Sequence, residues 1–215
     1  MSTRNTTIVI IIITGLLLAA GAALSPFLPA QGATHWNAQG QADGSSSRGF
    51  VIFFLPLMGL GTSLFILFLP QIDPKRANIA LFRSDYNLFV IFFLGFMGTI
   101  HMLSLAWNLG WQVNMIKAMV PIFAGLSYFI GHLMGKARQN WFIGIRTPWT
   151  LSSETVWNKT HQQAAFWYKV SAGVSLVGLL MPEGIAFIFV IAPLILVSLY
   201  AVGYSFVEYQ REQKV

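Results

Sequence analysis

The chain has 215 residues, of which 55% are hydrophobic and only 9% charged, and it contains no cysteine. A soluble domain of this length needs more charge on its surface, so the composition excludes that class and indicates a protein embedded in lipid. The lack of cysteine excludes disulfides and cysteine-ligated zinc, and the net charge of +6 is spread over short segments rather than gathered into a nucleic-acid-binding stripe.

Six apolar runs follow one another along the chain, and each is close to the roughly 20 residues that a helix needs to cross hydrocarbon. They cover residues 8–28, 50–69, 88–109, 115–134, 166–181 and 184–206. The first run is longer than the core of a signal peptide, about 7–15 residues, which favours a helix over a cleaved leader. The sequence therefore predicts an all-α integral membrane protein, a bundle of six transmembrane helices.

Small residues form a stripe along the first predicted helix, at Gly15, Ala19, Ala22 and Ala23. Such stripes allow another helix backbone to approach closely. We expect this face of the helix to be packed.

Lysine and arginine are distributed unequally between the segments that connect the runs. One alternating set holds Arg4, Lys75, Arg76, Arg83, Lys136, Arg138, Arg146, Lys159, Arg211 and Lys214, whereas the opposite set holds only Arg48 and Lys117. Short loops rich in these cations stay in the cytoplasm. The asymmetry predicts a multi-pass plasma-membrane protein with both the N and C termini cytoplasmic.

The loop between the first two runs, predicted to lie outside the cell, contains His35, Trp36, Asn37, Gly40 and Asp43. Gly40 and the pair formed by Asp43 and the following glycine are turn residues, and Trp36 has the amphipathic character of an interfacial anchor. Loops often carry function. The segment is either a folded connector with one aromatic anchor or a binding surface, and the sequence leaves both open.

The loop between the fourth and fifth runs, predicted to be cytoplasmic, is rich in tryptophan and cations. Four of the seven tryptophans are Trp141, Trp149, Trp157 and Trp167, and Lys136, Arg138 and Arg146 lie among them. This composition is typical of a segment at the level of the lipid headgroups.

Local signals predict a helix within this loop. Thr147 precedes Pro148 and is expected to be extended, and Ser152 or Ser153 can cap a helix whose first turn holds Glu154. From there Trp157, His161, Ala164 and Tyr168 share one face at helical spacing. We expect an interfacial amphipathic helix that turns into the fifth transmembrane helix.

Arg146 is the strongest single candidate in the loop. A guanidinium on an extended segment after Gly144 can clamp a phosphate, a carboxylate or the carbonyls at a helix end. The structural alternative is a contact with a lipid headgroup or within the chain.

Residues 140–161 resemble the recurrent signature of the SdpI family of bacterial membrane proteins. The residues that carry the resemblance are Asn140, Gly144, Arg146, Thr147, Pro148, Trp149, Thr150, Glu154, Trp157, Thr160 and His161. The segment from His35 to Asp43 resembles the His-Trp-Asn motif of an N-terminal module often joined to that signature. The chain departs from the pattern at Gln139, where members commonly carry proline, and after His161, where they carry arginine followed closely by glycine.

The resemblance implies two modules, residues 1–70 with the outer loop and residues 71–215 with the cytoplasmic signature. It also implies a membrane-embedded immunity protein that protects its host from a secreted peptide toxin. In the best-known case a family member also holds a transcriptional repressor at the membrane. The partners that the resemblance implies are therefore a peptide toxin, the lipid bilayer and, as in that case, a cytoplasmic transcriptional repressor. It implies no direct contact with nucleic acid.

The residues also bear on two other classes of protein, enzymes and transporters. The histidines His35, His101, His132 and His161 fall at four depths and do not form one metal site, and no catalytic motif is present, so we predict no enzyme and no cofactor. A small-solute or ion transporter is the alternative, because His101, Ser104 and Asn108 share a face of the third predicted helix. The alternative for the same residues is a structural role, in which a neutral His101 forms hydrogen bonds between helices.

Overall fold

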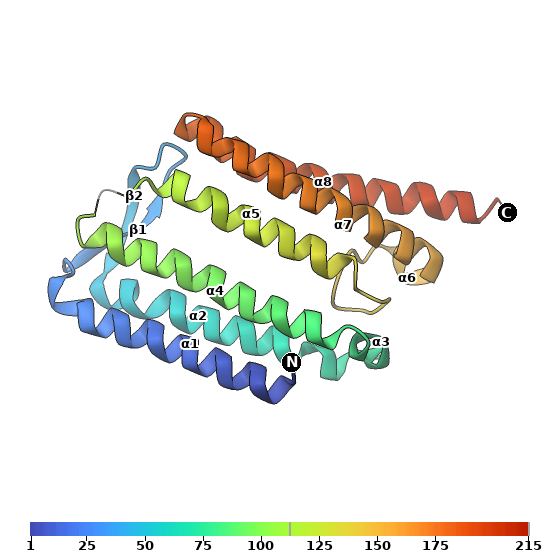
Figure 1. Ribbon diagram of the computed structural model, residues 1–215, viewed down its shortest axis with the longest axis horizontal. Helices are drawn as coiled ribbons and strands as arrows, with labels where there is room; N and C mark the ends of the chain where they lie inside the picture. Colours follow the sequence, from blue (N-terminus) through green and yellow to red (C-terminus); the bar gives the residue numbers. More distant parts are fainter. Residues whose placement is uncertain (112, 215) are drawn as a thin grey trace.

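Long helices lying side by side make up most of the structure, a computed structural model that describes residues 1–111 and 113–214 (Figure 1). They are α1 (Thr3–Leu24), α2 (Arg48–Phe68), α4 (Arg83–Asn108), α5 (Met115–Met134), α7 (Glu154–Val177) and α8 (Glu183–Glu212). The shorter elements are η1 (Ser25–Phe27), β1 (Gln31–Trp36), β2 (Ala42–Ser47), η2 (Leu69–Ile72), α3 (Arg76–Ala80), α6 (Pro148–Ser152) and η3 (Gly178–Leu180).

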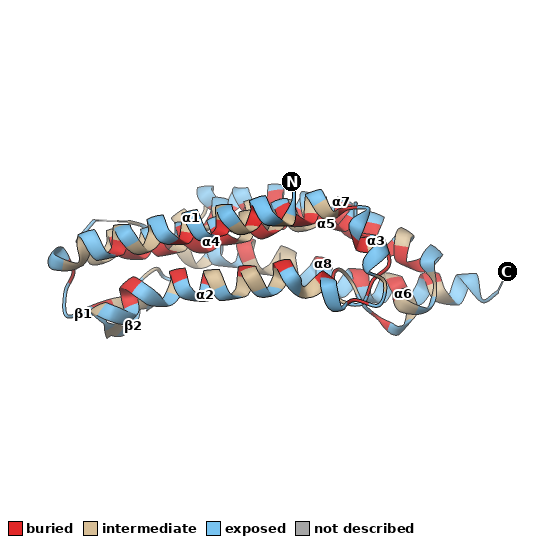
Figure 2. Ribbon diagram, turned by 90° about the horizontal axis from the view of Figure 1, so that it is seen from below, coloured by how far each residue is buried: buried red, intermediate tan, exposed pale blue. Residues whose placement is uncertain are grey.

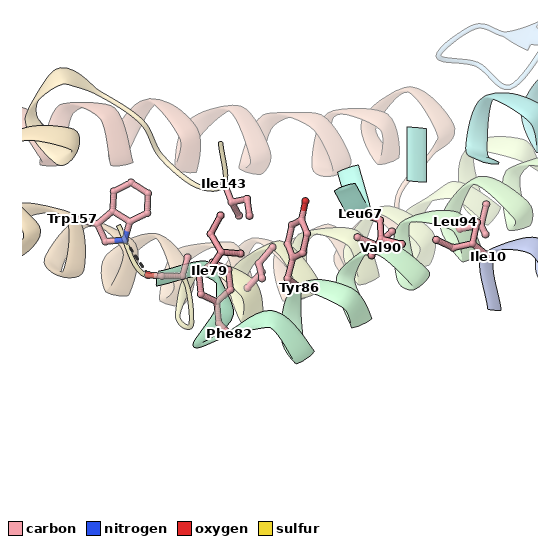
Figure 3. Close-up of a cluster of buried hydrophobic side chains, with 11 residues drawn as sticks. Ile10, Leu67, Ile79, Phe82, Tyr86, Val90, Leu94, Ile143 and Trp157 are labelled. Carbon is pink, nitrogen blue, oxygen red and sulfur yellow. Dashed lines mark hydrogen bonds between the residues drawn. The ribbon is translucent and has the colours of Figure 1, made fainter. Parts of the chain in front are cut away.

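The helices form two groups of three. Helices α1, α2 and α4 pack against one another, α5, α7 and α8 do the same, and α4 joins the groups by packing on α5. We call the end that carries β1 and β2 the hairpin end, and the opposite end, with residues 69–82 and 135–153, the motif end. The largest cluster of buried apolar side chains lies toward the motif end and draws Leu67, Tyr86 and Trp157 from different segments (Figure 3).

Large apolar side chains cover the outward faces of the helices. Leu16, Phe65 and Leu199 are each about two-thirds exposed, at 66%, 67% and 65%, and Figure 2 shows the exposed residues running along the outer sides of the helices. In water such a surface would aggregate, whereas in a bilayer it faces lipid. The chain is a multi-pass protein of the plasma membrane.

Five helices of the described chain are long and apolar enough to span a bilayer, namely Thr3–Phe27, Arg48–Ile72, α4, α5 and α8. The fifth predicted span, residues 166–181, lies in α7. Helix α7 is not among these five helices, and its first half contains the polar residues Glu154, Lys159 and His161. The count of six spans therefore stays a prediction, although α7 lies alongside α5 and α8 (Figure 1).

The interfacial position expected of the helix that leads into the fifth predicted span stays a prediction. Helix α7 runs without interruption from Glu154 to Val177, and Ser153 caps it by accepting a hydrogen bond from the Val156 amide. The face that carries Trp157, Thr160 and His161 is buried in the protein. This face packs among residues of the motif end. The helix continues into the fifth predicted span without a bend.

The prediction of an all-α fold needs one correction. Residues 31–47 form a hairpin in which β1 pairs antiparallel with β2, from Gln31 opposite Ser47 to Trp36 opposite Ala42. The register shifts beside His35, which is paired with Gly44. The turn therefore lies at residues 37–41, and Asp43 and Gly44 belong to a strand, not to the turn that their sequence predicted.

Both chain ends lie away from the hairpin, on the side of α3 and α6 (Figure 1). The cation-rich loops 69–82 and 135–153 lie at the same end. This arrangement is the one that the cation asymmetry requires, since a single orientation then places every cation-rich segment on one side of a bilayer. Which side is cytoplasmic stays a prediction.

The small-residue stripe of α1 does not pack within the described chain. Gly15, Ala19, Ala22 and Ala23 are exposed, and a side chain added at Gly15 would meet no atom within 4 Å. The buried face of α1 is instead Thr6, Ile10, Thr14 and Gly21. At Gly21 the helix approaches α2 closely, because an added Cβ would lie 2.9 Å from Cγ2 of Ile52.

The two glycines therefore make a matched pair. Gly21→Leu should destabilise the protein by about 1–3 kcal/mol, because the larger side chain overlaps Ile52 where the helices touch. Gly15→Leu should leave the stability unchanged. Thermal unfolding in detergent measures both, and equal melting temperatures for the two variants would contradict this packing of α1 on α2.

Candidate functional site

The motif-end loop begins with a turn built by one side chain. Oδ1 of Asn140 accepts hydrogen bonds from the amides of Phe142 and Ile143, at 3.0 and 2.6 Å, and its Nδ2 donates to the carbonyls of Arg138 and Ile143. Asn140 is fully buried. All the hydrogen-bonding capacity of this amide is used to hold the loop, which is a structural role.

The loop then packs on α7 through a close approach of backbone to ring. Nε2 of His161 accepts a hydrogen bond from the Ile145 amide at 3.0 Å, and Nδ1 donates to the Trp157 carbonyl at 2.8 Å. Gly144 has φ +113°, and a Cβ there would lie 2.4 Å from Nε2 of His161. Only glycine fits between the loop and the imidazole.

Trp157 completes this contact. Its indole stacks on the imidazole of His161 with ring centroids 3.9 Å apart, and its Nε1 donates to the Ala137 carbonyl at 3.0 Å. Both rings are almost wholly buried. Trp157 is therefore a core residue that ties the end of α5 to α7, not the interfacial anchor that tryptophan density suggested.

His161 is neutral in the folded protein. The ring is 2% exposed, and burial lowers the pKa of His161 to about 4, while the hydrogen bond to Trp157 partly opposes that shift. Neutral imidazole has one donor and one acceptor nitrogen, and both are used here. Protonation would remove the acceptor for the Ile145 amide and place a charge in the core.

Thr147 is extended, as the sequence predicted, and it caps α6, a short helix that the sequence did not predict. Its backbone has φ −95° and ψ 161°, and Pro148 follows it at the first helical position. Thr147 and Thr150 form a capping box, in which the side chain of each accepts a hydrogen bond from the backbone amide of the other. The Thr147 hydroxyl also lies 3.0 Å from the hydroxyl of Ser205, which joins the loop to α8. Thr150 additionally donates to the Ile145 carbonyl at 2.7 Å, so this pair of threonines fixes the whole segment.

Residues that the sequence did not single out as site residues anchor the loop on the side of α3. Nε2 of Gln139 donates to the carbonyls of Thr150 and Leu151, and its Oε1 accepts from Lys75. The Trp141 amide donates to Asp73, a carboxylate that is 2% exposed. In the sequence, Gln139 was noted only because it departs from the family pattern. In the structure it forms hydrogen bonds that connect segments far apart in the sequence.

The other residues of the motif differ in exposure, and three of them lie where a partner can reach them. Arg146 is exposed, and its Nη1 makes one hydrogen bond, to the Trp141 carbonyl at 3.1 Å. Glu154 and Pro148 are exposed, and Trp149 is half-buried against Phe206. Thr160 is buried, and its hydroxyl has no hydrogen-bond partner among the described residues.

At the hairpin end Asn37 and Gly40 build the turn. Oδ1 of Asn37 accepts from the amides of Gln39 and Gln41, both at 3.0 Å, and Gly40 has φ +74°. Beside this turn Nδ1 of His35 lies 2.5 Å from Oδ1 of Asp43, and both side chains are largely exposed, at 72% and 44%. His35 and Asp43 are therefore a pair of exposed polar groups that the hairpin offers to a partner, beside the exposed Gln39 and Gln41.

Trp36 faces the helices instead of solvent. It stacks edge-to-face on Trp107 of α4 with centroids 5.8 Å apart, and its Nε1 is buried with no hydrogen-bond partner in the described part of the chain. Trp36 lines two apolar cavities of about 240 and 140 Å³, the larger of which also contacts α5 and α8. The hairpin thus covers apolar space between the two helix groups.

The polar face of α4 is divided between two environments. Asn108 binds the hairpin, since its side chain accepts from the Ala33 amide at 2.7 Å and donates to the Ala33 carbonyl at 3.0 Å. His101 is wholly buried, and neither ring nitrogen has a hydrogen-bond partner among the described residues. Asn108 is therefore committed to a structural contact with the hairpin, whereas His101 makes no such contact among the described residues.

The geometry defines a membrane protein with an exposed polar hairpin at one end and a hydrogen-bonded, cation-bearing loop at the other. Residues 136–205 match the SdpI/YfhL protein family, and residues 12–60 match a domain of unknown function, DUF1648. The chain is 30% identical over 151 residues to the immunity protein SdpI of Bacillus subtilis (strain 168), which covers 70% of both chains. The chain belongs to the SdpI family, and no solved structure matches it significantly.

Gly144 gives the sharpest test of the motif-end packing. Gly144→Ala should destabilise the protein by about 2 kcal/mol or more, because it combines a positive φ with overlap on His161. Gly135→Ala is the control, since its added Cβ would only touch Ala165 at 3.4 Å. Melting temperatures in detergent decide, and equal loss in both variants would show that the loop is not held against His161.

His161 should also make stability depend on pH. The unfolded chain takes up a proton near pH 6.5, but the folded chain does so only near pH 4, so stability is constant above pH 6.5 and falls as the pH drops between these values. From pH 7 to pH 5 the loss is about 2 kcal/mol. His161→Gln removes the titration but keeps an acceptor, and its unfolding should lack this component. Identical pH profiles for the variant and the parent would exclude a neutral buried His161.

Proposed function

We propose that the chain protects its host cell from a secreted peptide toxin that acts on the membrane. Membership of the SdpI family carries this proposal, together with the 30% identity to a protein named for immunity. The name describes a binding or protective role and no chemical step. The arrangement of the site supports that role, since it offers recognition surfaces at the two ends of a helix bundle.

The hairpin end is the proposed site of toxin contact. It lies outside the cell in the orientation that the cations predict, where a secreted peptide arrives first. Its exposed His35 and Asp43 provide polar contacts, and the 240 Å³ cavity beside Trp36 has an apolar lining suited to a hydrophobic side chain. We assign this task to residues 1–70, the N-terminal module.

The motif end is the proposed site of a second, cytoplasmic task in residues 71–215, the capture of a transcriptional repressor. A cavity of about 620 Å³ opens there, and Lys136, Arg138 and Gln162 are among its exposed lining residues. Arg146 is also exposed. These cations suit an acidic surface on a soluble partner.

The two tasks should separate when single residues are changed. Asp43→Ala or His35→Ala should lower the toxin concentration that a cell survives on the order of tenfold, because an exposed contact is lost without disturbing the turn. Gln39→Ala, at the exposed tip of the same hairpin, is the control. Arg146→Ala should leave survival intact and weaken induction of a repressor-controlled reporter.

The experiment uses cells challenged with a cognate peptide, with each variant present at equal membrane abundance. Arg146→Lys distinguishes a bidentate contact, which it should lose, from a simple charge effect, which it should keep. If cells without the chain survive as well as cells that produce it, the immunity function is wrong. In that case transport of a small solute or ion becomes the hypothesis to test, by flux into proteoliposomes.

A further inference from the structure

A second cationic cavity lies at the motif end, apart from the loop of residues 135–153. Its volume is about 890 Å³, and it is formed by the start of α1, η2, α3 and the start of α4. Arg76 and Arg83 line it together with the polar Thr3 and Gln71, and none of its described lining residues is acidic. Neither arginine forms an ion pair with a described carboxylate.

Arg83 is held in place within this cavity. Its Nη2 donates to the Leu67 carbonyl at the end of α2, at 2.7 Å, and its guanidinium lies over the ring of Tyr86, 5.5 Å from the centroid. Its Nε is buried and has no hydrogen-bond partner among the described residues. A half-buried guanidinium with only a carbonyl and an aromatic face as partners retains a positive charge that an anion can neutralise.

The depth of the cavity indicates where that anion comes from. Arg83 precedes the apolar run that begins at Leu88 by five residues, or about 7 Å along a helix. The interfacial layer of a bilayer extends about 5–7 Å beyond the hydrocarbon on each side. We therefore expect Arg83 to lie at the level of the lipid phosphates.

Large apolar side chains are exposed beside the cavity. Ile72 and Leu81, which flank the ends of α3, are 69% and 74% exposed. Pro70, Ile79 and Ala80 give the cavity apolar walls beside its two cations. This mixture of an anion-binding group and apolar surface matches a glycerophospholipid, whose phosphate adjoins acyl chains.

We propose that the cavity between α1, η2, α3 and α4 binds the phosphate of an anionic phospholipid, with Arg76 and Arg83 as its ligands. The site is independent of the proposed immunity function, because it lies on a different part of the motif end from Arg146 and on the opposite end from the hairpin. Bound lipid would join the ends of α1, α2 and α4, the helices of one group.

Titration of the purified chain in neutral detergent tests this site, with the melting temperature as the readout. The added probes are phosphatidylglycerol, phosphatidylcholine and inorganic phosphate. Phosphatidylglycerol should stabilise the wild-type chain, and R76Q should weaken its apparent affinity about tenfold through loss of a charge-assisted contact. Arg76 is exposed and no hydrogen bond of its side chain is present in the described structure, so R76Q should fold normally.

R138Q is the matched control, since it removes the same charge from another exposed position at the same end. Its affinity for phosphatidylglycerol should stay within twofold of wild type. R83K keeps the charge but loses the fork, and it should weaken lipid binding as R76Q does.

Three results would overturn the proposal. Equal affinity in wild type and R76Q would show that the cavity is not the site. Equal weakening by R76Q and R138Q would indicate general attraction of a cationic surface to anionic lipid. Stabilisation by inorganic phosphate at the same concentration would identify a site for a soluble anion and exclude the lipid.

Discussion

The hydrogen-bonded imidazole of His161 is the contact on which the motif end depends. Its two nitrogens join the Trp157 carbonyl of α7 to the Ile145 amide of the loop, and they do so only while the ring is neutral. A buried polar ring without partners would be costly in a protein whose surroundings are largely hydrocarbon. Gly144 is the consequence, because no side chain fits where the loop meets the ring.

The same requirement explains why most of the family signature is structural in this chain. Asn140, Thr147, Thr150 and Trp157 each satisfy backbone groups that would otherwise be buried without partners. Gln139 and Asp73 extend the network to the segment before α4. The buried residues of the signature therefore hold the loop in place, and the exposed ones, Arg146 among them, are the smaller set that we propose for contact with a partner.

The hairpin end follows a different principle. A short antiparallel hairpin has only marginal stability by itself. Here Asn108 and Trp107 of α4 contact β1 and hold it against the helices. The hairpin covers apolar space between two helix groups that are otherwise joined by the packing of α4 on α5. Polar residues that do not serve this attachment, His35 and Asp43 among them, are left on the surface. One chain thus presents a different chemistry at each end of the bilayer.

The sequence by itself determined the membrane class, the positions of most long helices, the extended Thr147 and the family, because these depend on hydrophobic length, local backbone preferences and a long continuous motif. It also limited the cap of α7 to Ser152 or Ser153, and the structure selects Ser153. Only the tertiary structure decided which residues are buried. Trp157 resembled an interfacial anchor, yet it lies in the core, and Gly15 resembled a packing site, yet it faces outward. Periodicity predicts which residues share a face of a helix, but it does not predict what that face packs against. The hairpin was missed because strand pairing joins residues across a turn, and a run of small polar residues carries no alternation. The roles of Gln139 and Arg83 depend on segments far apart in sequence, so their geometry arises only when the chain folds.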